Sequence, residues 1–450
     1  MDRNRLEENP RRPPLPRVLR VKMRAVRTYT RTDVMTRSLA GLVLATVVCG
    51  ACTDASPSET TTVVDSASVR IVTNLPASIE AVEVWSLSTE PVVEIGAGAT
   101  PDVPLYQVTD VTPLDADRVA VGTNTPPQTL IFGAHGTLAA TLGREGEGPG
   151  EFATVTSVVP LDGDSVAVWD QNRRRISVFT GDGRYVREVD LSGLALLTPL
   201  AAASMDGLTA WTHLLPSAPG SFVLFQVGLT GDPGPGVIRV EAPSYRITAA
   251  GAEQARLGPF PGQELYHFGA GQGGVYPYPL GAATYGATVG GAFVVGTADA
   301  PEYRIYGVTG APEWIVRWPD HDRTVGGPLL AEWTEVRATW FASMSAGQRE
   351  FLDRMPQPER FPAYDGIIAG DGGRVWVGEY VGPLEIPYPP LHVRVPERSW
   401  LVFDAAGALT ATVRTPMGFQ PHAVRDERIW GVFTDELDVE SIRAYEVVKR

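Results

Sequence analysis

Residues 155–170 read VTSVVPLDGDSVAVWD, and the chain holds a close copy of them, VTDVTPLDADRVAVG, at residues 108–122. The offset between the two is 47 positions, and IFGAHGTL from residue 131 matches VFTGDGRY from residue 178 at the same offset. A chain that repeats itself at such a period is built from copies of one structural unit, as in solenoids and propellers. The fold therefore depends on what one copy of this unit forms.

Each copy predicts four short strands joined by two tight turns and a polar loop, with almost no helical periodicity. The first turn is rich in Asp and Gly and recurs at residues 115–117, 162–164, 206–207, 371–373 and 426–427. The second turn has an apolar or aromatic residue four positions before a glycine. It recurs at Phe132 and Gly136, Phe179 and Gly183, Val227 and Gly231, Tyr306 and Gly310, and Phe403 and Gly407.

A four-stranded sheet of this kind cannot bury both of its apolar faces alone. Copies must stack on each other, and closure of the stack into a ring removes the exposed sheet edges. Three segments break the rhythm, at residues 241–280, 319–363 and 381–398, and without them residues 67–450 hold close to six copies. We therefore expect an all-β fold, a six-bladed β-propeller with a short helical insertion between blades 4 and 5.

The last copy, from Pro421, has only three predicted strands, and residues 85–95 predict a strand that belongs to no complete copy. We expect this N-terminal strand to complete the last blade. The two ends of the domain would then join and close the ring.

A glycine-rich segment, LGREGEGPGEF at residues 142–152, links the first two copies. A phosphate-binding loop would lead into a helix, whereas this segment leads into a strand, so we interpret it as a connection between blades. With VAVWDQNRRRISVFTGDGRY at residues 166–185 it resembles the NHL-type repeat, although Asn172 stands one position early and Arg173 takes its place. SVRIVTN at residues 68–74 and RIWGVFTDELDVESIRAYEV at residues 428–447 resemble the bacterial six-bladed β-propeller lipoproteins of unassigned function.

The N-terminus reads as an export signal. A basic stretch precedes LAGLVLATVV at residues 39–48, which is too short to span a bilayer, where about 20 residues are needed. Gly50-Ala51-Cys52 resembles a bacterial lipobox, with Cys49 where Leu is usual, so we expect Cys52 to carry the lipid. The alternative is a buried N-terminal helix with two incidental cysteines.

This interpretation divides the chain into an N-terminal extension with a lipoprotein signal peptide (1–51), a flexible tether (52–66) and the propeller (67–450). Translation could start at Met1, Met23 or Met35. Residues 1–51 hold eleven Lys or Arg against four Asp or Glu, whereas residues 52–450 hold 27 against 48. The acidic domain disfavours nucleic acid as a partner. We expect an extracytoplasmic, membrane-anchored monomer.

The three insertions are expected on one face of the ring, because the strands of a blade alternate in direction. Residues 319–363 predict two helices, with Trp333 and Trp340 on one side of the first and a capping box at Ser345 and Gln348 opening the second. This insertion is either a lid over the central channel or a plug that packs on neighbouring loops.

Candidate binding residues follow from the same insertions. Residues 381–398 are rich in Pro and Tyr and predict a stiff loop with aromatic surface. Trp333, Trp340, Tyr380 and Tyr388 are therefore candidate ligand contacts. Arg173 would suit an acidic ligand, and a solvated strand edge is its alternative role.

Signatures of catalysis are scarce. The sequence has no His-Glu-x-x-His, Gly-x-Ser-x-Gly or Walker motif, and its six histidines are scattered. Asp162 and Asp164 occupy a recurring hairpin turn, so we predict no metal site there and no cofactor, with calcium in the central channel as the alternative. The sequence favours a binding or scaffold module for a protein, peptide or glycan. The alternative is a metal-dependent propeller hydrolase or lyase, similar to lactonases. The sequence does not decide whether the protein is an enzyme, although it favours a protein without catalytic activity.

Cys52 is the one lipid acceptor that the sequence predicts. We therefore expect Cys52→Ser to abolish incorporation of a labelled fatty acid and to release the protein from membranes, as measured by metabolic labelling and fractionation. Cys49→Ser is the matched control and should keep both the label and the membrane association. Persistent labelling of the Cys52→Ser protein would refute the anchor.

Overall fold

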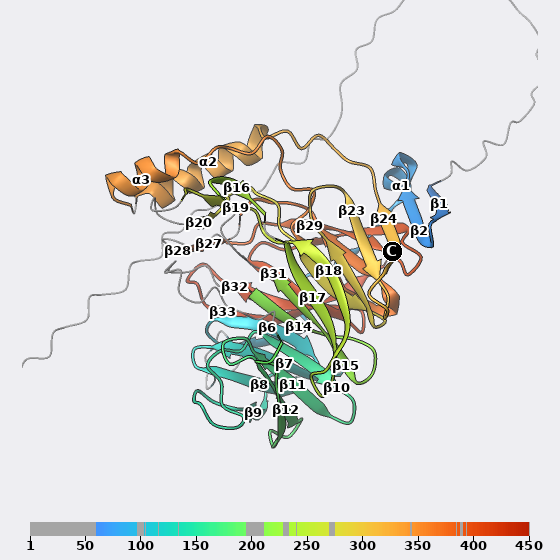
Figure 1. Ribbon diagram of the computed structural model, residues 1–450, viewed down its shortest axis with the longest axis vertical. Coiled ribbons are helices and arrows are strands. Elements are labelled where there is room, and N and C mark those ends of the chain that lie inside the picture. Colours follow the sequence, from blue (N-terminus) through green and yellow to red (C-terminus); the bar gives the residue numbers. More distant parts are fainter. Residues whose placement is uncertain are drawn as a thin grey trace, which may run out of the picture.

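The structure is a computed structural model, and it describes residues 60–449 apart from 97–102, 104, 116, 134, 195–210, 228–233, 240, 270–274, 343, 384, 388, 389 and 393. Six four-stranded antiparallel blades surround a central axis (Figure 1). The predicted fold, a six-bladed β-propeller with a helical insertion between blades 4 and 5, is confirmed. Among the described residues, no helix is long and apolar enough to cross a membrane.

In each blade the first strand lies innermost and the fourth lies at the outer rim. Blade 1 is β6 (Val108–Pro113), β7 (Arg118–Asn124), β8 (Pro127–Gly133) and β9 (Leu138–Leu142), and blade 2 is β10 (Ser157–Leu161), β11 (Ser165–Asp170), β12 (Arg175–Thr180) and β13 (Tyr185–Asp190). Blade 3 is β14 (Trp211–Pro216), β15 (Ser221–Val227), β17 (Glu241–Thr248) and β18 (Glu253–Pro261), and blade 4 is β21 (Tyr285–Val289), β22 (Ala292–Gly296), β23 (Glu302–Tyr306) and β24 (Pro312–Arg317). Blade 5 is β25 (Gly366–Ala369), β26 (Val375–Gly378), β29 (Arg398–Phe403) and β30 (Leu409–Thr415), and blade 6 is β31 (Phe419–Arg425), β32 (Arg428–Thr434), β33 (Glu440–Val448) and the N-terminal β5 (Val93–Gly96).

The alternation of side chains along each strand builds the core. In β11, Val166 and Val168 pack in a cluster with blade 1, whereas Ala167 and Trp169 pack in a cluster with blade 3. Because successive side chains of a strand point to opposite faces, one apolar strand such as VAVW serves two cores. Apolar clusters of this kind join every pair of neighbouring blades around the ring.

The ring closes as the sequence predicts. β5 pairs antiparallel with β33, with Ile95 opposite Ile442 and Val93 opposite Ala444. Ile95 is fully buried, and the Glu94 carboxylate accepts from the Arg443 guanidinium at 2.7 Å. The strand from the N-terminal end of the domain is thereby the outer strand of blade 6.

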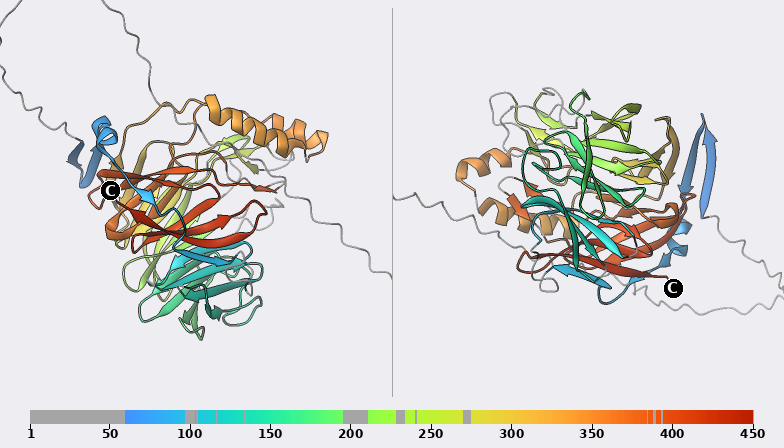
Figure 2. Two further views of the ribbon diagram at one scale, coloured as in Figure 1. Left: turned by 180° about the vertical axis from the view of Figure 1, so that it is seen from behind. Right: turned by 90° about the horizontal axis from the view of Figure 1, so that it is seen from below.

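The N-terminal segment also extends the rims of blades 4 and 5. β1 (Thr61–Ser66) and β2 (Val69–Asn74) form a hairpin that pairs through β2 with β24, and β3 (Glu83–Val84) pairs with β30 after the short α1 (Pro76–Ala81). These strands lie outside the ring in both views of Figure 2. Residues 61–66, which we expected in the tether, therefore form an edge strand.

Asn74 fastens this segment to two blades. Its buried side-chain amide donates to the carbonyl oxygens of Arg317 and Gly407 at 3.0 Å each, and its Oδ1 accepts from the backbone of Leu409 at 2.8 Å. One side chain thus links the ends of blades 4 and 5. An extension held in this way blunts two of the outer sheet edges.

Blade 3 differs from its prediction. Its first turn was assigned to residues 206–207, which lie outside the described residues, whereas the β14–β15 turn is at residues 217–220. Its second turn was assigned to Val227 and Gly231, whereas it lies at Gly251, whose N–H donates to the Thr248 carbonyl. Residues 241–261, assigned to an insertion, are the third and fourth strands. Two irregularities in the β17–β18 register break the alternation that the repeat comparison depends on.

Ring closure generates a stability prediction. Val93→Asp with Ile95→Asp places two charges in the cluster between blades 6 and 1, so we expect a loss of at least about 4 kcal/mol or failure to fold. Val63→Asp with Val64→Asp, in the exposed β1, is the matched control and should change the unfolding free energy by under about 1 kcal/mol. Thermal and urea unfolding measure both, and equal stability of the two variants would contradict closure by β5.

Candidate functional site

The insertions gather on one face of the ring, which we call the decorated face. It is formed by the connections from a fourth strand to the next first strand and by the loops between second and third strands (Figure 1). The elements there are β16 (Gly236–Ile238), β19 (Leu265–His267), β20 (Val275–Pro277), α2 (Gly327–Ala342), α3 (Ala346–Asp353), β27 (Glu385–Pro387) and β28 (Pro390–His392). β16, from a loop within blade 3, pairs with β19 from the connection that follows the same blade.

The predicted capping box opens α3. The Ser345 N–H donates to Gln348 Oε1 at 2.9 Å, and the Gln348 N–H donates to Ser345 Oγ at 3.3 Å. These bonds satisfy two of the donors that a helix N-terminus leaves unpaired.

Trp333, Val336 and Trp340 share one face of α2 and pack with Leu280 and Leu352 in an apolar cluster. Trp333 is 8% and Trp340 is 5% exposed. Both tryptophans are therefore core residues of the insertion as well as candidate ligand contacts. Phe361 and Tyr380 belong to the same cluster, and their rings stack at 5.9 Å between centroids.

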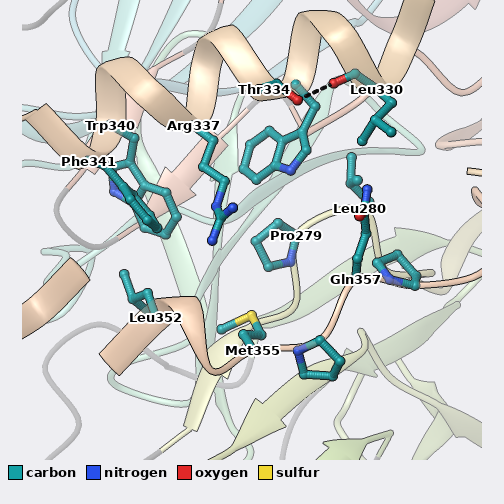
Figure 3. A pocket seen from close by; sticks show the side chains of 13 residues that line it. Pro279, Leu280, Leu330, Thr334, Arg337, Trp340, Phe341, Leu352, Met355 and Gln357 are labelled. Atoms are coloured by element: carbon teal, nitrogen blue, oxygen red, sulfur yellow. Dashed lines mark hydrogen bonds between the residues drawn. The ribbon is translucent and has the colours of Figure 1, made fainter. Parts of the chain in front are cut away.

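An open hollow of about 180 Å³ lies between α2, α3 and two proline-containing segments (Figure 3). Most of its lining residues are apolar or aromatic, and the surface that they expose to the hollow is about half polar. They are formed by residues of α2 (Leu330, Trp333, Thr334, Arg337, Trp340, Phe341), by Leu352 of α3, and by Pro279, Leu280 and residues 355–358.

Arg337 is the one cationic side chain in the lining of this hollow. Its guanidinium lies over the Phe341 ring, 4.5 Å from the centroid, and donates to Asp353 Oδ1 at 2.6 Å. Because both partners are at least partly exposed, this pair is weak in water and can be exchanged for a ligand group. The hollow thus offers aromatic surface beside one positive charge.

A second polar group lies where blades 4 and 5 meet the channel. Tyr285 begins the innermost strand of blade 4, Tyr380 follows β26, and Arg398 begins β29. The Arg398 side chain is 1% exposed, contacts the Asp365 carboxylate and lies over the Trp400 ring at 4.5 Å. Burial lowers the pKa of Arg398 to about 10, so the guanidinium stays charged at neutral pH. We call Tyr285, Tyr380 and Arg398 the mouth cluster.

A third group lies within the channel. Asp110 of blade 1, His213 of blade 3 and His422 of blade 6 come from strands that are far apart in sequence. Asp110 Oδ1 lies 3.7 Å from His422 Nδ1, and Asp110 Oδ2 accepts from the Val158 backbone at 2.8 Å. Burial lowers the pKa of His213, the Asp110 charge opposes this effect, and His422 adds to it.

Backbone irregularities aim two of these side chains. The ladder between β31 and β32 has a bulge at His422, next to the pair Pro421 and Gly431. A β-carbon at Gly431 would lie 2.1 Å from the Gln420 carbonyl oxygen, so the bulge requires glycine there. A second bulge, at Thr109, precedes Asp110. Bulges commonly re-aim a side chain at sheet edges and active sites.

The residues that we predicted as contacts separate into two places. Trp333, Trp340 and Tyr380 meet in the cluster of the insertion. Arg173 lies on the loop after β11, 3.8 Å from both the Asp170 and the Glu147 carboxylates, and is not part of that cluster. Cys52 and Tyr388 lie outside the described residues. Among the residues that the structure describes, no three His, Cys, Asp or Glu side chains are grouped to hold a metal ion.

Sequence reasoning missed the mouth cluster and the channel group. Tyr285 and Arg398 begin ordinary strands, and His213 and His422 have no neighbouring signal in sequence. One available clue was that His213 and His422 both fall near the start of an inner strand, where side chains approach the channel. A strand count that placed blade 3 correctly would have shown this.

The lowered pKa of His213 generates a prediction on pH. The unfolded chain binds a proton at this histidine near its ordinary pKa of 6.5, whereas the folded chain resists it, so stability is lost as pH falls below 6.5. This histidine changes the free energy of unfolding by at most about 1.4 kcal/mol per pH unit. His213→Phe should flatten the dependence of the urea-unfolding free energy on pH between about pH 7 and 5, relative to the parent. Parallel slopes for parent and His213→Phe would contradict the burial argument.

Comparisons with known proteins give matches among solved structures. No protein-family model and no curated protein sequence match the chain. Among solved structures, a putative exported protein from Bacteroides fragilis is 11% identical, with 82% of this chain and 96% of that chain covered and a TM-score of 0.47. A member of the DUF4221 family from Bacteroides vulgatus is 12% identical, with 82% and 100% covered and a TM-score of 0.45.

Virginiamycin B lyase from Staphylococcus aureus is more distant, at 10% identity and a TM-score of 0.37, with 81% of this chain and 100% of that chain covered. Likenesses at these levels carry no argument about activity. The blade topology described above is what identifies the chain as a six-bladed β-propeller.

Proposed function

We propose that this chain is a lipid-anchored, extracytoplasmic binding module that holds a protein, peptide or glycan segment on its decorated face. The signal sequence and the cysteine at position 52 support the anchor.

The observation that carries the proposal is the hollow between α2 and α3. Ligand sites are typically concave and mostly apolar, with a small number of polar groups that fix orientation. The hollow combines aromatic, Leu and Pro walls with the Arg337 guanidinium at its side. Its rim residues Thr334 and Gln357 are exposed, so a ligand reaches it from solvent without a change in the fold.

Because Trp333 and Trp340 are buried, other residues of the hollow are expected to make most of the contacts with a ligand. Because both side chains hold the insertion together, their free surface toward the hollow is small, and the more exposed Phe341, Met355 and Arg337 present most of the contact area. The tryptophan side of the insertion packs against neighbouring segments, and the residues that line the hollow form the proposed binding surface.

The alternative function, a propeller hydrolase or lyase, has one supporting observation. Asp110, His213 and His422 reach the channel from three blades, and a carboxylate beside an imidazole is a common acid–base arrangement. We place it second because the Asp110–His422 separation of 3.7 Å is longer than a hydrogen bond.

Peptide and glycan arrays probed with the purified protein test the proposal. We expect ligands that bind the parent to lose at least about thirtyfold in affinity to Phe341→Ala with Met355→Ala, as aromatic anchors at hot spots cost about 2 kcal/mol or more. Val186→Ala with Val308→Ala, exposed apolar positions outside the hollow, should retain the affinity. All variants must first unfold at the temperature of the parent.

Two outcomes would overturn the proposal. One is equal binding by the parent and the hollow variant, which would place the ligand elsewhere. The other is chemical turnover of a bound ligand that stops in His422→Ala but persists in the hollow variant, which would favour the channel and the enzymatic alternative.

A further inference from the structure

The mouth cluster has hydrogen-bond donors that the protein itself does not use. The Nη1 atom of Arg398 is buried and has no hydrogen-bond partner among the described residues. Buried polar groups are nearly always paired, so an unpaired donor of this kind needs an explanation.

Two close contacts of the Arg398 side chain show the direction in which its guanidinium extends. A β-carbon at Gly378 of β26 would lie 2.5 Å from Arg398 Nη2, and one at Gly366 of β25 would lie 3.1 Å from it. The guanidinium therefore crosses from the third strand of blade 5, over the second, to the start of the innermost strand. Two glycines leave room for it, and its direction is toward the channel.

Tyr285 lies near this guanidinium, and Arg398 Nε donates to the backbone oxygen of Glu379, the residue before Tyr380, at 3.2 Å. The Tyr285 ring is 6.2 Å from that of Tyr364, and the Arg398 charge is close enough to oppose the effect of burial on the Tyr285 hydroxyl. Tyr380 stacks on Phe361 beneath the helical insertion, and its own pKa is raised by burial and by Tyr285. The three side chains thus converge from blades 4 and 5 at the decorated ends of their strands.

The protonation states make this a cluster of donors. Burial raises the pKa of Tyr285 to about 12 and raises that of Tyr380, so both phenols keep their protons at neutral pH. Arg398 also stays charged. A guanidinium with two phenol groups complements an anion with more than one acceptor oxygen, and a planar carboxylate matches the fork of the guanidinium.

Asp365 is the acidic group that competes for this site. It contacts Arg398, and its Oδ2 accepts from the Val381 backbone at 3.2 Å. Asp365 thereby holds the guanidinium in place and leaves the Nη1 edge for a second acceptor. A guanidinium has donors enough for two carboxylates.

We infer that Arg398, Tyr285 and Tyr380 bind a carboxylate group of the ligand at the channel mouth. This inference rests on the proposed function and names the chemistry of its ligand, an acid that carries apolar or aromatic surface. The carboxylate lies at the mouth cluster, and the remainder of the ligand extends outward beneath and beside the helical insertion, where Tyr380 and Phe361 connect the two sites.

The test uses a matched pair of probes and the full mature chain. N-acetylphenylalanine and N-acetylphenylalaninamide differ only in the carboxylate, and titration calorimetry or ligand-observed NMR gives the two dissociation constants. We expect the acid to bind at least tenfold more tightly than the amide. Glucuronic acid, compared with glucose, shows whether a sugar acid is accepted in place of a peptide-like acid.

Tyr285→Phe with Tyr380→Phe removes only the two hydroxyl groups, so the fold is retained. Arg398→Gln is avoided because it would leave the Asp365 carboxylate without its cationic partner. In the double variant, the affinity for the acid should fall about tenfold, and the affinity for the amide should stay unchanged. Tyr185→Phe, in blade 2, is the matched control and should bind as the parent does. Equal affinity for acid and amide, or an unchanged affinity of the double variant for the acid, overturns the inference.

These outcomes are separate from those of the hollow. Loss of acid binding in the double variant, with array ligands still weakened by Phe341→Ala and Met355→Ala, supports both sites. If the double variant still binds the acid, the inference that the mouth cluster binds a carboxylate is refuted. The proposal that the hollow binds a ligand is not affected by this result.

Discussion

The structure depends on the fact that a four-stranded blade has two apolar faces and needs a neighbour on each. A strand such as β11 sends Val166 and Val168 to one side and Ala167 and Trp169 to the other, so no blade is stable by itself. A ring is the arrangement in which every face is covered. The pairing of β5 with β33 supplies the last covered face, and the apolar cluster between blades 6 and 1 includes residues from both ends of the domain.

Once the ring is closed, the two sides of the protein are unequal. The tight hairpin turns lie on one side, where residues such as Asp426 and Glu427, both with positive φ, leave little room for insertions. Every long insertion is on the other side, since the wider connections between strands emerge there. The hollow, the mouth cluster and the entrance to the channel are consequently on one face.

The sequence predicted the parts that repeat. Blades 1 and 2 were recognised because their 47-residue offset preserves the alternation, and the capping box at Ser345 and Gln348 is a local pattern with a known geometry. Blade 3 was misplaced because register shifts in β17 and β18 break that alternation. The insertion at Trp333 and Trp340 was recognised as helical, whereas the side of it that faces a ligand depends on packing.

The mouth cluster could not be predicted, because its side chains come from residues 285, 380 and 398 and meet only through the ring. Arg398 reaches inward because Gly366 and Gly378 lack side chains, and neither glycine lies in a turn pattern that would draw notice. The three residues come from segments that are far apart in the chain, so no local sequence pattern connects them.

The closure of blade 6 also orders events in time. Glu94 and Arg443 are 349 residues apart, so a ribosome must finish almost the whole domain before these strands can meet. Until then blade 1 has an uncovered face and the chain remains an open arc. The same delay leaves apolar sheet faces uncovered until the last strand is made, and uncovered faces of this kind favour aggregation.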